Sequence, residues 1–176
     1  MSPSEPPSRS ELDGLFRSGA GEARREAMDL ALLHRAQWDK RWGGLFLRWA
    51  RTAEADTADF LGARLLGPLW LAGEIEPRQL VALSLWPSVW PWRTGLLALT
   101  PSLQRNGADW PLFEQFAKAC LGEDSRFGRE RQAFNGLGRA LRAAKRGCPE
   151  LARSWLDRHE PVLQGFSALE QQEVSP

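Results

Sequence analysis

The side chains that could carry out acid–base chemistry are few in this sequence, and they lie far apart. Two histidines, His34 and His159, occur in 176 residues, and neither belongs to an HExxH pattern or a Cys/His cluster of the kind that binds zinc. Asp157 and His159 could in principle form an acid–base pair. Successive residues on a helix point in different directions, so a solvated helix end is the better interpretation of this segment.

Carboxylate pairs and glycine-rich motifs give no stronger signal for catalysis. Asp56 and Asp59 lie near one helix face, but capping of a helix explains Asp56 without any further role. Gly19–Gly21 lacks the lysine of a phosphate-binding loop, and Asn135–Gly138 holds a bare GxG inside a helical pattern. No set of nucleophile, base and orienting group can be assembled from these residues. The sequence therefore predicts a protein that is not an enzyme.

The two cysteines, Cys120 and Cys148, are widely separated and lack CxxC spacing. Such a pair is typical of free or buried thiols and not of a metal site. We therefore predict no bound metal and no cofactor.

Cations are concentrated in one stretch of the chain, where contact with a polyanion is the simplest chemistry they could serve. From Arg126 to Arg146 there are seven cations and one anion, Glu130, a local charge of +6 in a chain whose total is +1. A cationic helix of this kind predicts contact with a nucleic-acid backbone. The cations are Arg126, Arg129, Arg131, Arg139, Arg142, Lys145 and Arg146.

The elements that would position these residues are all helices. Apolar residues recur at three- and four-residue spacing and no alternating run favours a strand, so we expect an all-α, compact helical bundle of about seven to nine helices. Gly43–Gly44 and Gly67–Pro68 are expected to break or kink helices, and two prolines are expected to exclude a regular helix from Trp86–Trp92. The expected helices are 22–42, 45–54, 56–71, 78–86, 93–99, a helix capped by Asp109 and ending at Leu121–Gly122, the basic helix 124–146, 149–159, and one beginning at Pro161.

The length of the chain fits one domain. Residues 1–10 are rich in proline and serine and are predicted to be a disordered leader, residues 11–172 a helical domain, and residues 173–176 a polar tail. Sub-lobes at 22–90 and 91–172 are an alternative description of the helical domain. No apolar run is long enough to cross a bilayer and no signal peptide begins the chain, so we predict a cytoplasmic protein without membrane contact.

The predicted basic helix has two distinct sides. Its apolar residues follow the 3.6-residue period and are expected to face the core, whereas Arg139, Arg142 and their neighbours project elsewhere. A solvated cationic face remains the alternative to a binding surface. The apolar residues are Phe127, Phe134, Leu137, Leu141 and Ala144.

Nine tryptophans are an unusual number for a chain of this length. Most are expected to pack in the core. Trp90 and Trp92, which lie beside Arg93, are the best candidates for rings that stack on a base. Together with Trp86 they also form a candidate partner-binding surface.

Several segments resemble the small subunit of the type I-E CRISPR surveillance complex, Cascade, over about residues 76–135. The segments that carry the resemblance are Asp109-Trp110-Pro111-Leu112 followed by a helix to Cys120, Arg126–Arg131, Arg78–Leu83 and Trp92–Leu97.

This resemblance implies an all-α, non-catalytic subunit of a ribonucleoprotein complex that takes part in antiviral defence. Its partners would be the other subunits of the complex, a guide RNA and a target DNA, the nucleic acids being held by their backbones. By position, the backbone contacts implied by the resemblance are Arg78, Arg93, Arg126, Arg129 and Arg131.

A second function is compatible with the same residues. Tryptophan and arginine dominate protein interfaces, so the chain could be a cytosolic adaptor or inhibitor, such as a secretion-apparatus accessory protein, that docks through Trp86, Trp90 and Trp92. A salt-dependent affinity would favour nucleic acid over a protein partner. The sequence leaves self-association open.

Overall fold

The computed structural model describes residues 7–19, 21–121, 125–128 and 130–173. These residues form helices joined by short turns, without a strand among them, and the all-α prediction is confirmed. None of the described helices is long and apolar enough to span a membrane. The helices are α1 (Arg9–Arg17), α2 (Gly21–Leu33), the 3-10 turn η1 (Arg35–Gln37), α3 (Lys40–Arg51), α4 (Ala58–Phe60), the π-helical turn η2 (Leu61–Leu66), α5 (Gly67–Leu71), α6 (Pro77–Ser84), α7 (Val89–Ala98), α8 (Thr100–Arg105), α9 (Trp110–Ala117), α10 (Arg131–Gly147) and α11 (Pro149–Glu173).

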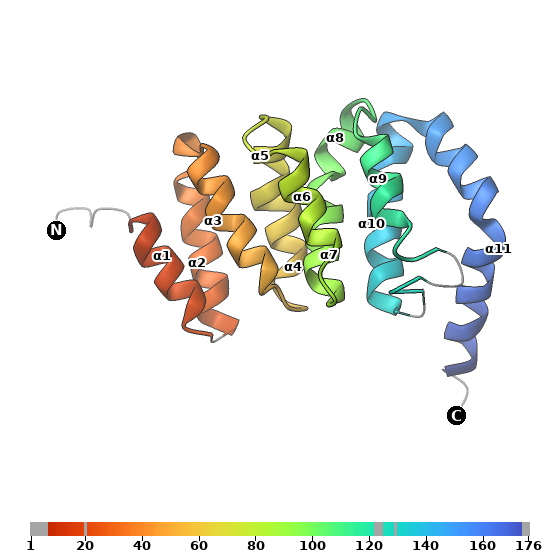
Figure 1. Cartoon of the computed structure of the whole chain (residues 1–176), viewed down its shortest axis with the longest axis horizontal. Coiled ribbons are helices and arrows are strands. Elements are labelled where there is room, and N and C mark those ends of the chain that lie inside the picture. Colours follow the sequence, from red (N-terminus) through yellow and green to blue (C-terminus); the bar gives the residue numbers. More distant parts are fainter. Residues whose placement is uncertain (1–6, 20, 122–124, 129, 174–176) are drawn as a thin grey trace.

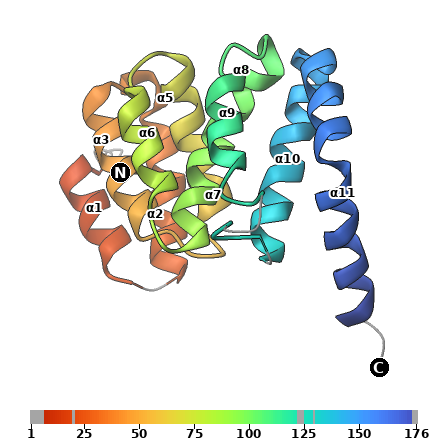
Figure 2. The same cartoon turned by 45° about the vertical axis from the view of Figure 1, so that its right-hand side comes forward.

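The helices stand side by side in a row along the long axis of the molecule, from α1 at one end to α11 at the other (Figure 1). The same order holds in the view turned by 45° (Figure 2). An amphipathic helix must cover its apolar stripe, and in this row each helix is covered by its neighbours. The buried side chains form one cluster that extends from Leu12 to Trp155. The proposed sub-lobes stay a prediction.

The first helix begins earlier than the sequence predicts. Ser8 caps α1 and forms a capping box with Glu11, so Arg9 and Ser10 are helical and do not belong to a disordered leader. Leu12 and Phe16 of α1 are buried, which fixes this helix against the rest of the row.

The break predicted at Gly43–Gly44 is wrong, and the helix does not end at Gly67–Pro68. Gly43 and Gly44 lie inside α3, and the chain bends instead between α2 and Lys40. A Cβ on Gly43 would stand 3.2 Å from the carbonyl oxygen of Glu74, so this glycine serves a close approach of two segments. At Gly67–Pro68 the chain stays helical from Ala58 to Leu71, because the preceding turns widen into the π-helical η2.

The predicted non-helical joint at Trp86–Trp92 is only half right. The turn covers residues 85–88, and α7 already begins at Val89 with Ser88 as its N-cap. Pro91 is tolerated because it lies in the first turn, where a backbone N–H has no partner within the helix.

The boundaries of the last helices also differ from the predicted ones. Asp109 is the N-cap residue of α9, as predicted, but its carboxylate accepts a hydrogen bond from Nε1 of Trp70 at 2.5 Å and makes no capping hydrogen bond; α9 ends at Ala117. The basic helix begins at Arg131, because Phe127 donates its N–H to the carbonyl of Ala119 and so leaves the helical path.

One helix, α11, replaces the two predicted to begin at Pro149 and Pro161. A proline inside a helix removes one backbone hydrogen bond, but α11 continues on both sides of Pro161. The predicted core side of the basic segment is confirmed, with Phe134 half-buried and the other four residues buried.

Candidate functional site

A carboxylate held by two arginines is the most distinctive polar cluster among the described residues. Arg93 of α7 donates to both oxygens of Asp59 in α4, from Nε at 2.6 Å and from Nη2 at 2.8 Å. Its remaining nitrogen, Nη1, donates to the backbone carbonyl of Gln132 at 2.7 Å. Arg139 of α10 also donates to Oδ2 of Asp59. The cluster thus joins α4, α7 and α10.

Burial differs sharply across the cluster. The side chain of Arg93 is 9% exposed, whereas those of Asp59 and Arg139 are 32% and 45% exposed. Arg93 is therefore enclosed with all three of its nitrogens engaged, and the edge of the cluster that solvent reaches consists of Asp59 and Arg139. A ligand would meet the carboxylate and the outer guanidinium first.

Two close helix contacts allow these side chains to meet. Gly62 of η2 lies against α7, where a Cβ would come within 2.5 Å of the carbonyl oxygen of Thr94. The hydroxyl of Thr94 lies 3.3 Å from the carbonyl oxygen of Ala58, at the start of α4, and 2.9 Å from that of Trp90 in its own helix. On the other side, Gly136 of α10 gives room to the stem of Arg93, whose Cγ would be 3.2 Å from an added Cβ. Glycine at both places brings the helices close enough for one arginine to reach Asp59.

The exposed side of α10 is a stripe of cations, which we call the α10 cationic stripe. At 100° per residue these side chains lie within about 120° of one another around the helix, and they extend over about 22 Å of its length. Arg139 stands in the middle of the stripe, so the Asp59 cluster adjoins it directly. No described residue forms an ion pair with Arg142, Lys145 or Arg146. The stripe consists of Arg131, Arg139, Arg142, Lys145 and Arg146, all of them exposed.

The other arginines singled out in the sequence do not belong to this stripe. Arg78 is exposed at the start of α6 and pairs with Glu76 at 2.6 Å. Arg126 lies in a turn and donates to the backbone carbonyls of Ser84 and Trp86. Arg129 lies outside the described residues. Arg93 is not available as a free backbone contact, because Asp59 and the backbone of α10 take up its donors.

The three tryptophans of the predicted docking surface lie in three different environments. Trp92 is fully buried and donates Nε1 to the carbonyl of Phe116 at 3.0 Å. Trp90 is half-buried, and Trp86 is 38% exposed. These residues do not form one exposed aromatic surface, and Trp86 is the most exposed of the three.

The remaining reactive side chains are poorly placed for chemistry. Both cysteines are free, as predicted. Burial raises the pKa of the Cys120 thiol to about 12, and burial also raises the pKa of Cys148. His159 binds the carbonyl of Trp155 through Nδ1 at 2.8 Å and packs on its ring, so it forms no pair with Asp157.

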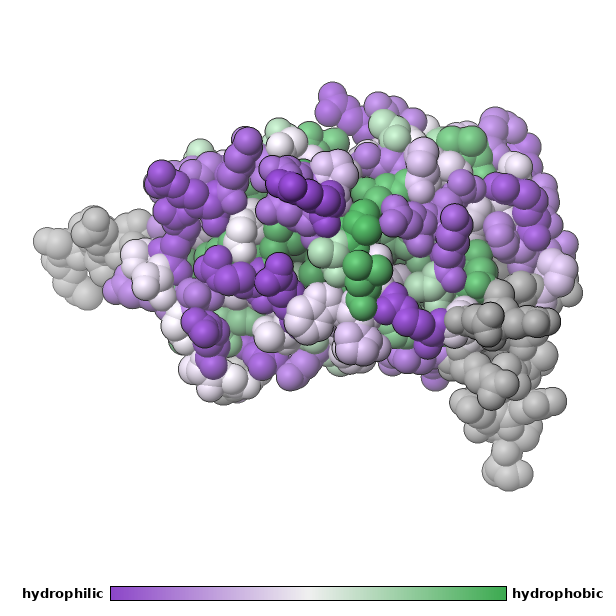
Figure 3. Space-filling model, viewed as in Figure 1, coloured by the Kyte–Doolittle hydropathy of each residue, from purple (hydrophilic) through white to green (hydrophobic). Residues whose placement is uncertain are grey.

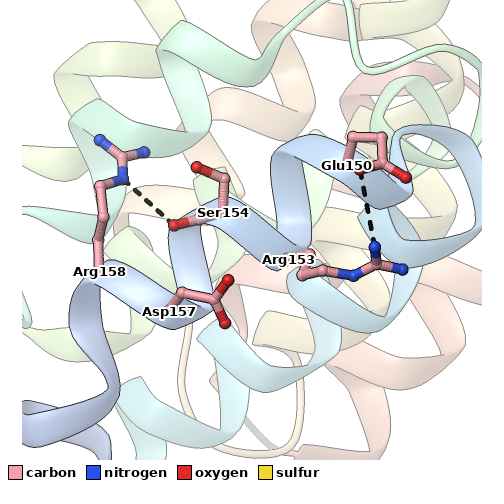
Figure 4. A pocket seen from close by; sticks show the side chains of 5 residues that line it. All are labelled: Glu150, Arg153, Ser154, Asp157 and Arg158. Carbon is pink, nitrogen blue, oxygen red and sulfur yellow. Dashed lines mark hydrogen bonds and ion pairs between the residues drawn. The ribbon is translucent and has the colours of Figure 1, made fainter.

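A shallow hollow of about 420 Å³ lies on the surface of α11, and its lining is polar (Figure 4). Its two arginines and Glu150 are already paired. Arg153 lies 3.7 Å from Glu150, and Arg158 donates to the carbonyl of Ser154 and to Glu114 of α9 at 3.0 Å. The hollow therefore offers less unsatisfied charge than the α10 cationic stripe does.

The sequence indicated Arg93 and Arg139 but missed Asp59. The signal that could have found Asp59 lies in α7, because Arg93 is the one charged residue between Val89 and Thr100 in an otherwise apolar run. A buried arginine requires an acidic partner. The sequence shows that Asp56 and Asp59 lie near one helix face, but it does not show which of the chain's carboxylates lies beside α7.

A cationic helix beside a fixed carboxylate is compatible with several families, and a comparison with family models decides among them. The model described as "DNA alkylation repair enzyme" matches residues 3–170, nearly the whole chain. The chain belongs to the DNA alkylation repair enzyme family. No curated protein and no solved structure gives a significant match.

Membership of the DNA alkylation repair enzyme family overturns the predicted function. The resemblance to the Cascade small subunit is wrong, and with it the predicted role in antiviral defence and the predicted partners, a guide RNA and the subunits of a ribonucleoprotein complex. The prediction that the chain is not an enzyme is also wrong, since the family is one of repair enzymes. The adaptor alternative is not supported either. Short matches among helices rich in leucine and arginine arise without common ancestry, and the resemblance consisted of such matches.

Proposed function

We propose that this protein removes alkylated bases from DNA by hydrolysis of the bond between the base and the sugar, with Asp59 as the catalytic carboxylate. The chain belongs to the DNA alkylation repair enzyme family, and one observation carries the proposal. Arg93 holds the partly exposed carboxylate of Asp59 in one orientation, directly beside the α10 cationic stripe.

The stripe supplies the affinity for DNA. Guanidinium and ammonium groups along about 22 Å of α10 can meet phosphates over about six base pairs. Such contacts position the duplex without reading its sequence. Arg139, at the middle of the stripe, would bring a phosphate close to Asp59.

The carboxylate supplies the chemistry. Alkylation of a ring nitrogen leaves a positive charge on the base, which makes the base a better leaving group. As the bond to C1′ of the sugar breaks, its electron pair leaves with the base, which becomes neutral, and positive charge develops on the sugar, as it does in glycoside hydrolysis. A water molecule from solvent then adds to C1′ and gives up its proton to solvent. A carboxylate that is already fixed in place stabilises that charge with little reorganisation. Asp59 is fixed by the bidentate bonds of Arg93, and Arg93 is fixed by the carbonyl of Gln132.

Transfer of the alkyl group to a cysteine is the competing chemistry for such a lesion, and the described thiols do not favour it. A thiol acts as a nucleophile in its thiolate form. Burial raises the pKa values of Cys120 and Cys148, so both thiols are held in the unreactive form at neutral pH.

The test is base release from a duplex that carries one 7-methylguanine, detected by alkaline cleavage of the strand at the resulting abasic site. We expect Asp59→Asn to lower the single-turnover rate about 100-fold or more, the loss typical when one electrostatic contact to a transition state is removed. Asp56→Asn is the matched control, since Asp56 is a neighbouring exposed carboxylate outside the cluster. A folded Asp59→Asn protein with the wild-type rate would refute the assignment of Asp59.

The stripe can be tested separately by measuring how the affinity for undamaged duplex depends on salt. Arg142→Gln should reduce the slope of log K against log salt by about 0.9, the value for one lost phosphate contact. An unchanged slope would remove Arg142 from the interface.

A further inference from the structure

The turn between α6 and α7, residues 85–88, exposes two large apolar side chains that no part of the proposed chemistry uses. Leu85 is 72% exposed and Trp86 is 38% exposed. An exposed apolar strip is visible over the region of α6 and α7 in the middle of the face shown in Figure 3, with hydrophilic side chains on both sides. An exposed apolar patch that is rimmed by polar side chains is typical of an interaction site.

Hydrogen bonds from other residues fix the backbone of this turn. Arg126 donates to the backbone carbonyls of Ser84 and Trp86, and so closes the turn from a segment forty residues further along the chain. Ser88 caps α7 by accepting a hydrogen bond from the N–H of Trp90. The side chains of Leu85 and Trp86 are thus presented on a braced backbone.

Arg126, which forms these hydrogen bonds, also brings a positive charge to the turn. Both acceptors of Arg126 are uncharged carbonyls, so these bonds do not neutralise its guanidinium. The same guanidinium lies over the ring of Phe127 at 5.1 Å, and Phe127 contacts Trp92 at 5.5 Å, next to Arg93. An apolar tip with a cation at its base is suited to a polyanion with flat apolar interior surfaces, which is the chemistry of DNA.

The turn lies close to the arginine that holds the proposed catalytic carboxylate. Trp86 is three residues before Val89, and Arg93 is four residues into α7, so their Cα atoms are at most about 17 Å apart. That distance corresponds to about five base-pair steps. In Figure 1 the chain enters α4, α7 and α10 at the same lower edge of the row, and the α6–α7 turn lies at that edge.

We propose that the α6–α7 turn is a wedge that unstacks DNA bases, with Leu85 and Trp86 packing against a base step while the duplex lies on the α10 cationic stripe. Apolar wedges of this type open the step between two bases, and an aromatic ring stacks on the exposed base. This inference rests on the proposed function, because it names the form of DNA that the same site accepts: a duplex whose stacking is already weakened, as at a lesion.

The experiment compares the affinities of the full-length protein for two duplexes of the same sequence, one fully paired and one with a single bulged adenine. A bulge lowers the cost of unstacking, so the wild type should bind the bulged duplex about 5- to 150-fold more tightly, the range expected for stacking of one base. Leu85→Ala with Trp86→Ala should bring the ratio to within two-fold of one without changing the salt dependence. Trp86→Phe should keep most of the ratio.

Two controls separate the wedge from general effects. Leu33→Ala removes an equally exposed leucine, 73% exposed on α2, and should leave the ratio unchanged. Base release from the 7-methylguanine duplex is measured in parallel for all variants. Because Leu85 is largely in solvent, Leu85→Ala alone should melt like the wild type, and it serves as the test if the double variant does not fold.

Three results would have distinct meanings. A ratio that is close to one in the wild type, or unchanged in the double variant, refutes the wedge; if Asp59→Asn still abolishes base release, the proposed function stands. A double variant that changes self-association but keeps the ratio also refutes the wedge and assigns the turn to a protein contact. If the wild type releases no base but the ratio is present and lost in the double variant, the proposed reaction fails and the wedge stands as a DNA-binding element.

Discussion

Replacing Gly62 by alanine tests whether the contact between η2 and α7 positions the Asp59 carboxylate. An added Cβ would stand 2.5 Å from the carbonyl oxygen of Thr94 and 2.9 Å from Cβ of Leu97. The first distance is about 0.9 Å short of the 3.4 Å at which ordinary contact begins. Both neighbours belong to the body of α7, so neither can turn aside as the end of a long side chain could.

The two segments must separate to accommodate the methyl group, and Asp59 and Arg93 lie on opposite sides of this contact. A shift of a few tenths of an ångström or more would lengthen hydrogen bonds that now measure 2.6 and 2.8 Å towards the limit of about 3.2 Å. Overpacking of this kind costs about 1–3 kcal/mol of unfolding free energy. At about 2–4 °C per kcal/mol for a chain of this size, the melting temperature should fall by about 2–12 °C.

The assay is thermal unfolding followed by circular dichroism, together with base release at a temperature where the variant is folded. Gly44→Ala is the matched control, because Gly44 lies inside α3 and nothing stands within 4 Å of its added Cβ. That control should stabilise the protein by about 0.5–1 kcal/mol, since alanine is the better helix former. If Gly62→Ala melts at or above the wild-type temperature with wild-type base release, the argument for a close contact is wrong.

Three further predictions follow from the same structure. Asp59→Leu with Arg93→Met should cost little stability, because replacing a largely buried arginine and its carboxylate partner together by apolar residues is often neutral; thermal melts should show this, and the same variant should release no base. Iodoacetamide should not label Cys120 at pH 8 until denaturant is added, because the thiol is buried and its pKa is about 12; labelling of the native protein would contradict the burial. The pKa of Glu11 is lowered from 4.5, mainly by the side chain of Ser8, so its contribution to α1 is present above pH 4.5 and is lost as the pH falls through the lower folded value; amide exchange in α1 should rise there, and Glu11→Gln should remove this pH dependence.

The helical content of the chain could be predicted from the sequence, because the apolar residues repeat with the helical period in nearly every segment. The errors concern glycine and proline, whose effects depend on context. Pro91 fits the first turn of α7, where no N–H is required, and Gly43 serves a close contact with Glu74 inside α3. A local pattern shows that such a residue could end a helix, but not whether tertiary contact gives it another use.

The candidate site was harder to predict because its parts meet only in the folded chain. Asp59 and Arg93 are 34 residues apart, and the backbone carbonyl of Gln132 that completes the coordination of Arg93 is 39 residues further on. The cations of α10 were visible as a cluster of like charge. The position of these cations next to Asp59 could not be predicted, because α10 is joined to Arg93 through a backbone carbonyl, and a backbone carbonyl leaves no pattern in the sequence.

Stability alone does not account for the third member of the cluster. Arg93 is already satisfied by the two oxygens of Asp59 and by the carbonyl of Gln132, and its burial explains why those partners exist. Arg139 adds a second guanidinium to the same carboxylate from a side chain that is 45% exposed. A pair exposed to that degree contributes about 0–1 kcal/mol, so it is a weak reason to place a cation there. Arg139 can leave Asp59 for a phosphate at little cost, whereas Arg93 cannot. The arrangement thus joins a carboxylate that stays fixed to a cation that can exchange partners, and DNA bound on the stripe would uncover the edge of Asp59 that faces it.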